Sequence, residues 1–208
     1  FLIRVQKHPC LYRHLLYCQL FVWVVKEEVE EEEELRQMQA DIWTFSHSVR
    51  QSMCTRKLQP LDLTGMVYGS QTLTGWARTN LDRHTIRCPM LNEPSAAFFA
   101  LYDGHHKSMA VNHVHAKLLD CISQALKKGS EVRQAVSMGM THCDNLYIQS
   151  PTVLTDDRFG SGSGAIVVMV QMGTLFTSNL GACRAVLCKG AEAEILSRDH
   201  VATDERES

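Results

Sequence analysis

The pattern of hydrophobic and polar positions predicts a mixture of strands and helices. Residues 97–102 are all apolar or aromatic and none is charged, which is typical of a buried strand. Apolar residues then recur every three or four positions over 108–126 and over 131–147, the spacing of two amphipathic helices. Further runs with glycine-containing turns between them predict strands over 165–170, 174–180, 184–188 and 192–196. Strands, two helices and a final meander give an α+β order.

The first 60 residues have a different character. Residues 11–25 form an apolar stretch that polar residues interrupt, and we expect a strand or a helix there, with a membrane anchor as the alternative. Residues 27–34 hold seven glutamates, a run that is typical of a solvated or disordered segment. Residues 35–49 place apolar side chains on one stripe, which predicts an amphipathic helix, and Pro60 closes this segment. We therefore expect an N-terminal extension over 1–60 and a domain over 61–208.

Length and composition limit the classes of function. A chain of 208 residues can bury one sizeable core, and 21 basic against 23 acidic residues give a net charge of −2. This balance predicts neither a nucleic acid nor an anionic membrane as the partner. The eight cysteines include no Cys-x-x-Cys pair, and the apolar N-terminal stretch lacks the small-residue cleavage site of a signal peptide. We expect an intracellular protein, cytoplasmic or nuclear, with reduced thiols.

The candidate chemistry begins where the buried strand ends, at Asp103, Gly104 and His105. A carboxylate at the mouth of a strand suits a divalent cation, because such cations prefer oxygen ligands on a rigid element. Gly104 allows a sharp turn and leaves its carbonyl open to a ligand, and His105 would stand beside the ion as a proton donor. An Asp-Gly turn after a strand is often purely structural. The three residues therefore need support from elsewhere in the chain.

Three further motifs supply that support: Gly75 to Arg83, Thr177 to Leu187 and Leu196 to His200. Together with Phe98 to His105, and in this order and spacing, they resemble the metal-dependent Ser/Thr phosphatases of the protein phosphatase 2C type. The resemblance covers 61–208 and implies two antiparallel sheets face to face with helices outside, in α-β-β-α layers. By this resemblance, residues 63–73 and 76–86 correspond to the family's first two strands. We expect a partial sandwich, because the chain stops before the family's later Asp-Gly-x-x-Asp and Asp-Asn motifs.

The resemblance also implies a reaction and a set of site residues. Members of the family hydrolyse phosphoserine and phosphothreonine with two Mg²⁺ or Mn²⁺ ions, which activate a bridging water and neutralise charge on the phosphoryl group. Asp103 matches the aspartate that bridges both ions, and Gly104 matches the glycine whose carbonyl is a ligand. Asp82 matches the second acid, and His105 matches the proposed general acid.

Several positions depart from the family pattern. Leu81 stands where the family has a metal-facing glutamate or a polar residue, and Ala182 replaces the aspartate of Gly-Asp-Ser-Arg. Neither leucine nor alanine offers a side-chain oxygen to a cation. His106 and Lys107 replace two glycines that follow the family's histidine. The metal ligands predicted for this chain are therefore fewer than the family's.

Two basic residues are candidates for binding phosphate. The family's arginine is expected five residues before Asp82, where this chain has Ala77. Arg78 is one position late, and on a strand it would point to the opposite face. Lys107 directly precedes Ser108, where the first helix is expected to begin, so its charge and the free helix amides would attract an anion without a metal. A solvated surface lysine is the alternative.

The remaining motifs favour structural roles. Histidines at 105, 106, 113 and 115 include the ligand type that zinc and nickel prefer. Residues two apart on a helix point away from each other, however, so His113 and His115 are not expected to chelate one ion. Residues 160–164 alternate Gly and Ser without the Gly-Lys-Ser/Thr of a phosphate loop. They resemble the family's Gly-Ser-x-Ala at the start of a strand.

Two functions from different classes follow. In the first, the chain is a degenerate phosphatase-like module, a pseudophosphatase, that binds a protein or phosphoprotein partner and catalyses nothing. In the second, it is an active Mg²⁺- or Mn²⁺-dependent phosphatase whose remaining ligands lie outside this chain. We favour the first, because Leu81 and Ala182 lie within the region that the resemblance covers. A partial sandwich also predicts unpaired strand edges and self-association through them.

Overall fold

The computed structural model describes residues 2–7, 18–23, 53–57, 63, 67–72, 79–150, 161–189 and 192–200. In chain order its elements are β1 (Leu2–Lys7), β2 (Cys18–Trp23), β3 (Met53–Lys57), β4 (Val67–Thr72), β5 (Arg83–Arg87), β6 (Ala97–His105), α2 (Met109–Lys127), α3 (Val132–Ile148), β7 (Gly162–Gln171), β8 (Thr174–Leu180), β9 (Cys183–Lys189) and β10 (Glu192–Ile195). These elements form an α+β fold, as the sequence predicts.

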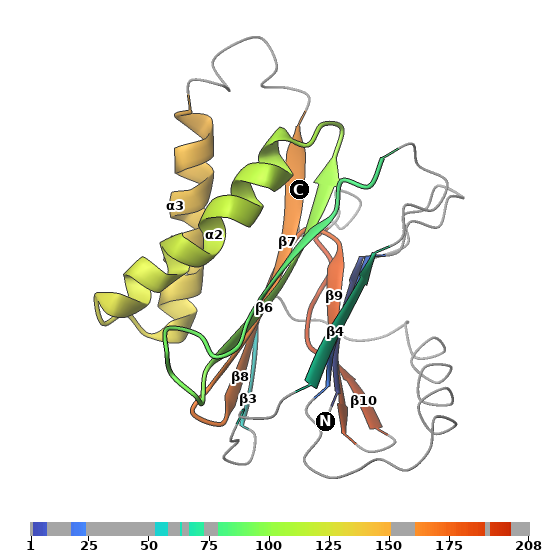
Figure 1. The fold of residues 1–208 in the computed structure, drawn as a ribbon, viewed down its shortest axis with the longest axis vertical. Coiled ribbons are helices and arrows are strands. Elements are labelled where there is room, and N and C mark those ends of the chain that lie inside the picture. Colours follow the sequence, from blue (N-terminus) through green and yellow to red (C-terminus); the bar gives the residue numbers. More distant parts are fainter. Residues whose placement is uncertain are drawn as a thin grey trace.

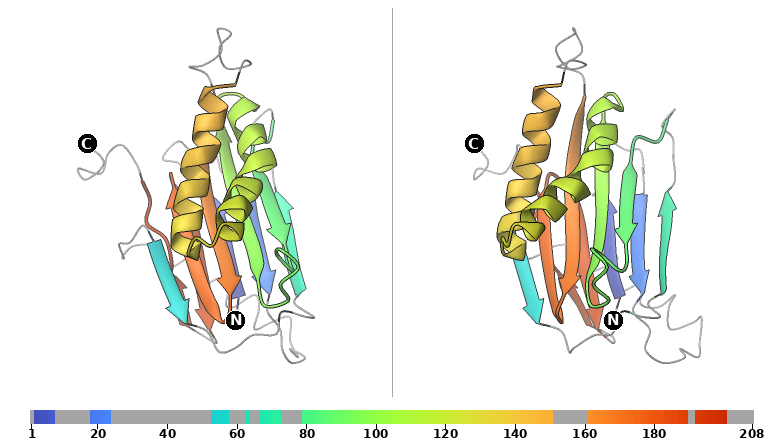
Figure 2. Two further views of the ribbon diagram at one scale, coloured as in Figure 1. Left: turned by 90° about the vertical axis from the view of Figure 1, so that its left-hand side faces the viewer. Right: turned by 60° about the vertical axis from the view of Figure 1, so that its left-hand side comes forward.

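The strands form two five-stranded sheets, in the orders β10-β9-β1-β2-β4 and β3-β8-β7-β6-β5. Neighbouring strands are antiparallel throughout both sheets. The sheets lie face to face, and α2 and α3 cover the outer face of the second one (Figure 1; Figure 2). In the described part of the chain, the outer strands of the sheets are β10, β4, β3 and β5.

The second sheet is built around β6 and β7, whose side chains are buried on both faces along most of their length. Successive side chains of a strand point to opposite faces. From β6, the core between the two sheets receives Ala97, Phe99 and Leu101. From the same strand, the core beneath the helices receives Phe98, Ala100 and Tyr102. A strand covered on both faces needs apolar residues at every position, which explains the unbroken apolar run.

The helices α2 and α3 pack on each other as well as on the sheet. Val111, Leu118 and Ile122 of α2 are fully or almost fully buried in the core beneath the helices. The helices approach closely at Gly139 of α3, where a Cβ would lie only 2.9 Å from the Ile122 backbone nitrogen. From this crossing they diverge toward the start of α2 and the end of α3, forming a V that opens at the top of Figure 1.

The structure confirms most of the elements that the sequence predicts. Both helices and the four C-terminal strands are present, with ends within three residues of those expected. The strand expected over 63–73 is present as β4. The strand expected over 76–86 is present as β5, but it begins only at Arg83. The predicted site residue Arg78 lies outside the described residues.

The first 60 residues contribute strands to both sheets. β1 lies between β9 and β2, β2 pairs with β4, and β3 pairs with β8. Within the apolar stretch 11–25, the strand alternative is therefore observed over Cys18–Trp23. The acidic run 27–34 and the helix expected over 35–49 lie outside the described residues. Of the two helix layers in the expected α-β-β-α order, the structure therefore tests only the one formed by α2 and α3. None of the helices in the described ranges is long and apolar enough to cross a membrane.

Candidate functional site

Asp82 and Asp103 lie side by side at one end of the second sheet. The register of β5 and β6 pairs Arg83 with Tyr102, so the next pair along the two antiparallel strands is Asp82 and Asp103. Side chains at directly opposite positions share one face of the sheet, with Cβ atoms about 5 Å apart. Asp82 is buried and Asp103 is partly buried. The structure thus brings together the two acids that the sequence singles out, here called the acid pair.

Gly104 stands where three segments meet beside the acid pair. A Cβ at this position would lie 2.6 Å from the carbonyl oxygen of Leu81 and 2.8 Å from Cγ1 of Val111 on α2. The segment before β5 is fixed in turn by Asn80, whose side-chain oxygen accepts a hydrogen bond from the Asp82 amide at 2.9 Å. Only a residue without a Cβ allows this close approach of backbone and helix.

Two glycines continue the row of the acid pair across the sheet. Gly164 is directly opposite Asp103 on β7, and a Cβ on Gly164 would lie 3.6 Å from the Cβ of Asp103. Gly181 follows β8 with a φ of 99°, and a Cβ there would lie 3.3 Å from the Gly164 Cα. Bare backbone therefore flanks Asp103 on this side. Ala182, where the family has an aspartate, comes directly after Gly181, the last residue of this row.

His105 lies on the same face of β6 as Asp103, since it is two residues further along the strand. Its exposed ring covers Gly162, the opposite residue on β7, and a Cβ on Gly162 would overlap the imidazole. His106 has a φ of 63° and forms a turn in which the Lys107 amide donates to the His105 carbonyl at 2.9 Å. The histidine thus occupies a left-handed conformation that glycine adopts without strain. This explains why a glycine suits this position in the family.

Ser161 ties the start of α2 to the start of β7. Its hydroxyl accepts a hydrogen bond from the Ala110 amide at 2.9 Å and donates one to the Lys107 carbonyl at 2.8 Å. Ser161 therefore caps α2, whereas the side chain of Ser108 makes no capping hydrogen bond. Lys107 is exposed next to this cap. The Ala110 amide, one of those expected to be open to an anion, is already bonded.

The two C-terminal motifs bind each other and hold the final segment against β9. Asn179 donates from Nδ2 to the carbonyl of Arg198 at 2.6 Å. Arg184 and Asp199 form a bidentate ion pair, with Nη2 2.7 Å from Oδ2 and Nε 3.0 Å from Oδ1. The Ser197 hydroxyl accepts a hydrogen bond from the β9 backbone at 2.9 Å. These residues of the family motifs therefore have structural partners in this chain.

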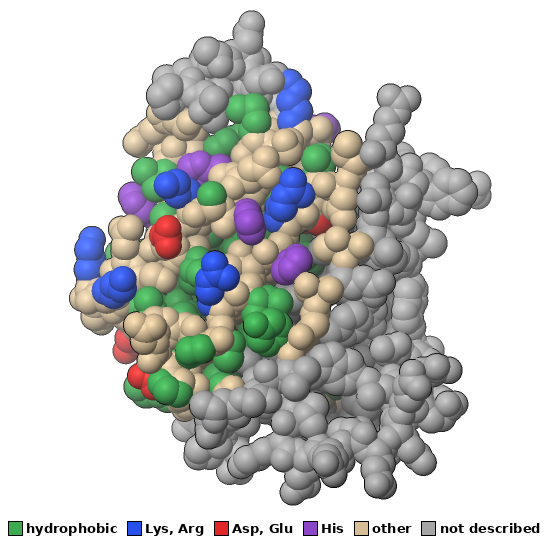
Figure 3. Space-filling view, viewed as in Figure 1, with side chains coloured by type: hydrophobic (Ala, Val, Ile, Leu, Met, Phe, Trp, Pro, Cys, Tyr) green, Lys and Arg blue, Asp and Glu red, His purple; other side chains and the backbone are tan. Residues whose placement is uncertain are grey.

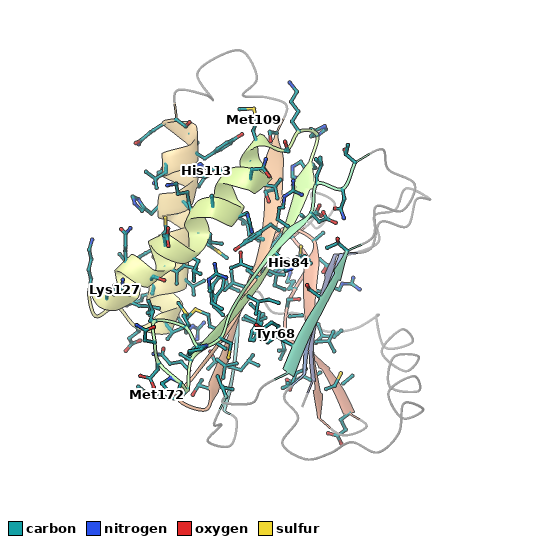
Figure 4. All side chains as sticks on the ribbon, in the orientation of Figure 1. Tyr68, His84, Met109, His113, Lys127 and Met172 are labelled. Carbon is teal, nitrogen blue, oxygen red and sulfur yellow. The ribbon has the colours of Figure 1, made fainter. Side chains whose placement is uncertain are left out.

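Burial disfavours the charged forms of two titratable groups near the acid pair. Tyr102 is fully buried, and burial raises the pKa of its phenol above the ordinary value, while the hydroxyl donates to Thr85 at 3.1 Å. His84 lies on β5, two residues beyond Asp82 (Figure 4). Burial, and then the charge of His115, lower the pKa of His84 below its ordinary value of 6.5. His84 is therefore mainly uncharged at pH 7.

The histidines of α2 contact different parts of the structure. The Nε2 atom of His113 lies 3.1 Å from the Cys143 carbonyl of α3, and its ring packs against Tyr147 (Figure 4). The ring of His115 instead packs edge-on against Tyr102, with 6.0 Å between centroids. The two side chains do not converge on one ion, as their spacing predicts.

The described residues of this site offer few ligands for the family's two metal ions. Asp82 and Asp103 provide two side-chain carboxylates, and Gly104 a backbone carbonyl. Two adjacent dications need more carboxylates than this to fill their coordination shells and to balance their charge. Across the described ranges, no three His, Cys, Asp or Glu side chains are grouped so that they could hold a metal ion. The described residues alone therefore do not fit a two-metal centre.

Sequence reasoning missed the roles of Ser161, Gly162 and Gly164. The available signal was the alternation of Gly and Ser over 160–164. On a strand, period-two alternation places the glycines on one face, next to Asp103 and His105, and the serines on the other, toward the helices. The same alternation that the sequence analysis interprets as the start of a strand therefore also shapes the site.

Comparisons with known proteins agree with this arrangement. The family model described as Protein phosphatase 2C matches residues 66–208. A probable protein phosphatase 2C of Caenorhabditis elegans is 33% identical over 147 residues, which cover 67% of this chain and 39% of that protein. Protein phosphatase 1B of Mus musculus is 30% identical over 153 residues, which cover 65% of this chain and 38% of that protein. The chain therefore spans less than two fifths of the length of either relative.

Solved structures resemble the fold. The serine-threonine phosphatase 2C of Toxoplasma gondii has a TM-score of 0.53 at 17% identity, over 74% of this chain and 56% of that chain. A sex determining protein of Caenorhabditis elegans has a TM-score of 0.54 at 16% identity, over 74% of this chain and 35% of that chain. At such identities the likeness concerns the fold alone. The family model, however, covers more than half of the sequence, and the chain belongs to the protein phosphatase 2C family.

Proposed function

We propose that this chain is a phosphatase-like module that binds a protein partner and does not hydrolyse phosphoesters. The observation that supports this most directly is where the two lost ligand positions lie. Leu81 contacts Gly104, the neighbour of Asp103. Ala182 follows Gly181, which adjoins Gly164 in the row of the acid pair. Leu81 therefore removes an oxygen ligand beside the acid pair, and Ala182 removes the aspartate that in the family serves an additional metal.

The partner in this proposal is a protein or phosphoprotein, in a cytoplasmic or nuclear setting. Figure 3 shows Lys, Arg and His side chains dispersed over the described part of one face, which gives no support to a nucleic acid as partner. A phosphate on the partner would meet the exposed Lys107, and we retain Arg78 as the second candidate. Loss of phosphopeptide binding in Lys107→Ala, measured in EDTA, tests this contact.

Self-association is a second part of the proposed binding role. The outer strands of the described sheets, β10, β4, β3 and β5, are the candidates for pairing with another copy. Sedimentation of the purified chain over a range of concentrations tests this. A single monomeric species at every concentration would count against it.

Mn²⁺ calorimetry and a phosphothreonine-peptide assay test the absence of catalysis. We expect wild type to show neither saturable Mn²⁺ binding nor Mn²⁺-dependent hydrolysis above buffer. The double variant Leu81→Glu/Ala182→Asp restores oxygen ligands and is expected to gain Mn²⁺ affinity. Its matched control, Leu81→Gln/Ala182→Asn, has the same size without the two charges. Wild-type turnover that disappears in Asp103→Asn would refute the proposal.

The second candidate function is an active Mg²⁺- or Mn²⁺-dependent protein serine/threonine phosphatase that takes its remaining ligands from outside this chain. The retention of Asp82, Asp103, Gly104 and His105 at one end of the sheet favours it. So does the short span of this chain along its relatives, 39% and 38% of their lengths. Metal-dependent turnover by a longer form of the protein, lost in Asp103→Asn, would establish this function instead.

A further inference from the structure

The V between α2 and α3 holds an apolar groove that the acid pair does not use. Its volume is about 420 Å³. Ala110, Val114 and Leu118 of α2 line one side, and Ala165 of β7 and Leu180 of β8 lie at its base. Leu180 is 55% exposed, unlike most large apolar side chains of the sheets. Small-molecule sites typically measure about 300–1,000 Å³ and are mainly apolar, so both size and lining suit a ligand.

The close crossing of the helices makes the groove a fixed feature. At Gly139 the helices touch backbone to backbone, since a Cβ there would lie 3.0 Å from the Ile122 Cα. Met140, the next residue, lines the closed end of the groove, and its sulfur accepts a hydrogen bond from the Ser178 hydroxyl at 3.7 Å. The helix crossing at Gly139 and the contact between Met140 and Ser178 hold α2, α3 and β8 together at one end of the groove. The two helices therefore separate only beyond that end.

A single carboxylate marks the groove. Asp144 of α3 is the one formally charged side chain among the described lining residues. It is exposed, and within the described ranges no hydrogen bond or ion pair engages its carboxylate. Burial raises the pKa of the neighbouring Cys143 thiol to about 12, so that lining residue stays neutral. Three lining hydroxyls are already bonded to backbone carbonyls: Thr141 to Ser137, Ser161 to Lys107, and Ser163 to Gly164.

We propose that this groove binds a small amphiphilic ligand with one ammonium group, the apolar body lying against Val114, Leu118 and Leu180 and the ammonium pairing with Asp144. Charge complementarity selects a cation, because the described walls carry one negative charge and no positive one. The groove is on the helix face of β7, where Ala165 points, whereas the acid pair is on the face toward the first sheet. Binding here is therefore independent of the phosphatase question.

Three matched probes test the proposal on the whole chain: octylammonium and octanoate, each below its micelle-forming concentration, and octanol, below its solubility limit. Amide chemical shifts followed by NMR should saturate with octylammonium at residues along the groove. We expect octanol to bind at least fivefold more weakly, and octanoate more weakly still. Added salt should weaken octylammonium binding and leave octanol binding unchanged.

Variants separate the apolar and the charged contributions. Asp144→Asn should lower the affinity for octylammonium at least fivefold without changing the affinity for octanol. Asp120→Asn is the matched control, since Asp120 is an exposed acid of α2 that does not line the groove. Val114→Phe should fill the groove and abolish the binding of both probes, provided that its amide spectrum remains that of a folded chain.

Three results would overturn the proposal. The first is equal affinity for octylammonium and octanoate, which would mean that the groove does not distinguish a cation from an anion. The second is an Asp144→Asn variant that binds octylammonium like Asp120→Asn. The third is a set of shifts that lies away from the groove or that rises without saturation.

Discussion

Replacing Gly104 with alanine tests how tightly the segments beside the acid pair are packed. The added Cβ would lie 2.6 Å from the Leu81 carbonyl oxygen, 2.8 Å from Cγ1 of Val111 and 3.0 Å from the Leu81 Cβ, whereas ordinary contact begins at 3.4 Å. The Leu81 oxygen belongs to the backbone, and Val111 is fully buried in α2. Neither neighbour can give way unless the segment before β5 or the helix moves.

Two effects oppose each other in this variant. Where the backbone conformation suits any residue, replacing Gly with Ala stabilises a protein by roughly 0.4–1 kcal/mol, because the unfolded chain loses freedom. Gly104 qualifies, since its φ is not positive. Overpacking a close-packed site costs about 1–3 kcal/mol. Overpacking is the larger effect, so we expect Gly104→Ala to lower the free energy of unfolding by about 1–2 kcal/mol.

Urea unfolding followed by circular dichroism measures this difference. Gly69→Ala is the matched control, because Gly69 also lies in a strand without a positive φ, and a Cβ there would meet no atom within 4 Å. The control should be as stable as wild type, or more stable by up to about 1 kcal/mol. If Gly104→Ala proves no less stable than Gly69→Ala, the three segments do not meet as tightly as described.

The other predictions concern a ring, an ion pair and a titration. Gly162→Ala should displace the exposed His105 ring at a cost of about 1 kcal/mol or less, so the NMR signals of the imidazole should move while urea stability hardly changes. Asp199→Ala should lower stability by about 1–3 kcal/mol, because it strips Arg184 of a bidentate partner at side chains only 18% and 20% exposed; a loss below about 0.5 kcal/mol would contradict this. The lowered pKa of His84 means that the unfolded chain binds more protons, so stability should fall as pH drops from 7 toward 5, and His84→Gln should flatten that fall; parallel pH profiles would show that another group is responsible.

The sequence predicted elements well wherever the signal is local. The run at 97–102 reads as a buried strand because both faces of β6 are covered, by the first sheet on one side and by α2 and α3 on the other. The two helices and the C-terminal strands follow from periods of 3.6 and 2 that burial imposes on one face or two. Short turns such as Met172-Gly173 then mark the ends of strands.

The place of the N-terminal strands could not be predicted in this way. β1 pairs with β9 across more than 170 residues of sequence, and no local pattern encodes such a partner. The apolar stretch at 11–25 is compatible with a strand, a helix or an anchor, because a continuous apolar run has no period to distinguish them. Its assignment as β2 depends on the sheet that receives it.

The same limit applies to the site. Asp82 and Asp103 are 21 positions apart, and it was the family resemblance that paired them before the register of β5 and β6 showed them adjacent. The groove above the helix crossing had no sequence signal of its own, and the alternation of Gly and Ser over 160–164 did not show which helix Ser161 would cap. The groove and the cap both depend on where β7 and α3 lie relative to α2, which is a tertiary relation.

The contacts divide the residues of the family motifs into two groups, one that stabilises the fold and one that concerns metal binding. Asn179 of β8, and Arg184 of β9 with Asp199, tie these strands to the final segment through hydrogen bonds, so their loss would cost stability. Position 81 adjoins the acid pair and position 182 follows Gly181 in the same row of the sheet, and leucine and alanine there leave those hydrogen bonds untouched. A chain can therefore keep the fold, and match the family over most of its length, while it loses oxygen ligands. For this reason membership of the family does not decide hydrolysis, whereas the wild-type assay does, and a gain of Mn²⁺ affinity in Leu81→Glu/Ala182→Asp would show that these two positions limit metal binding.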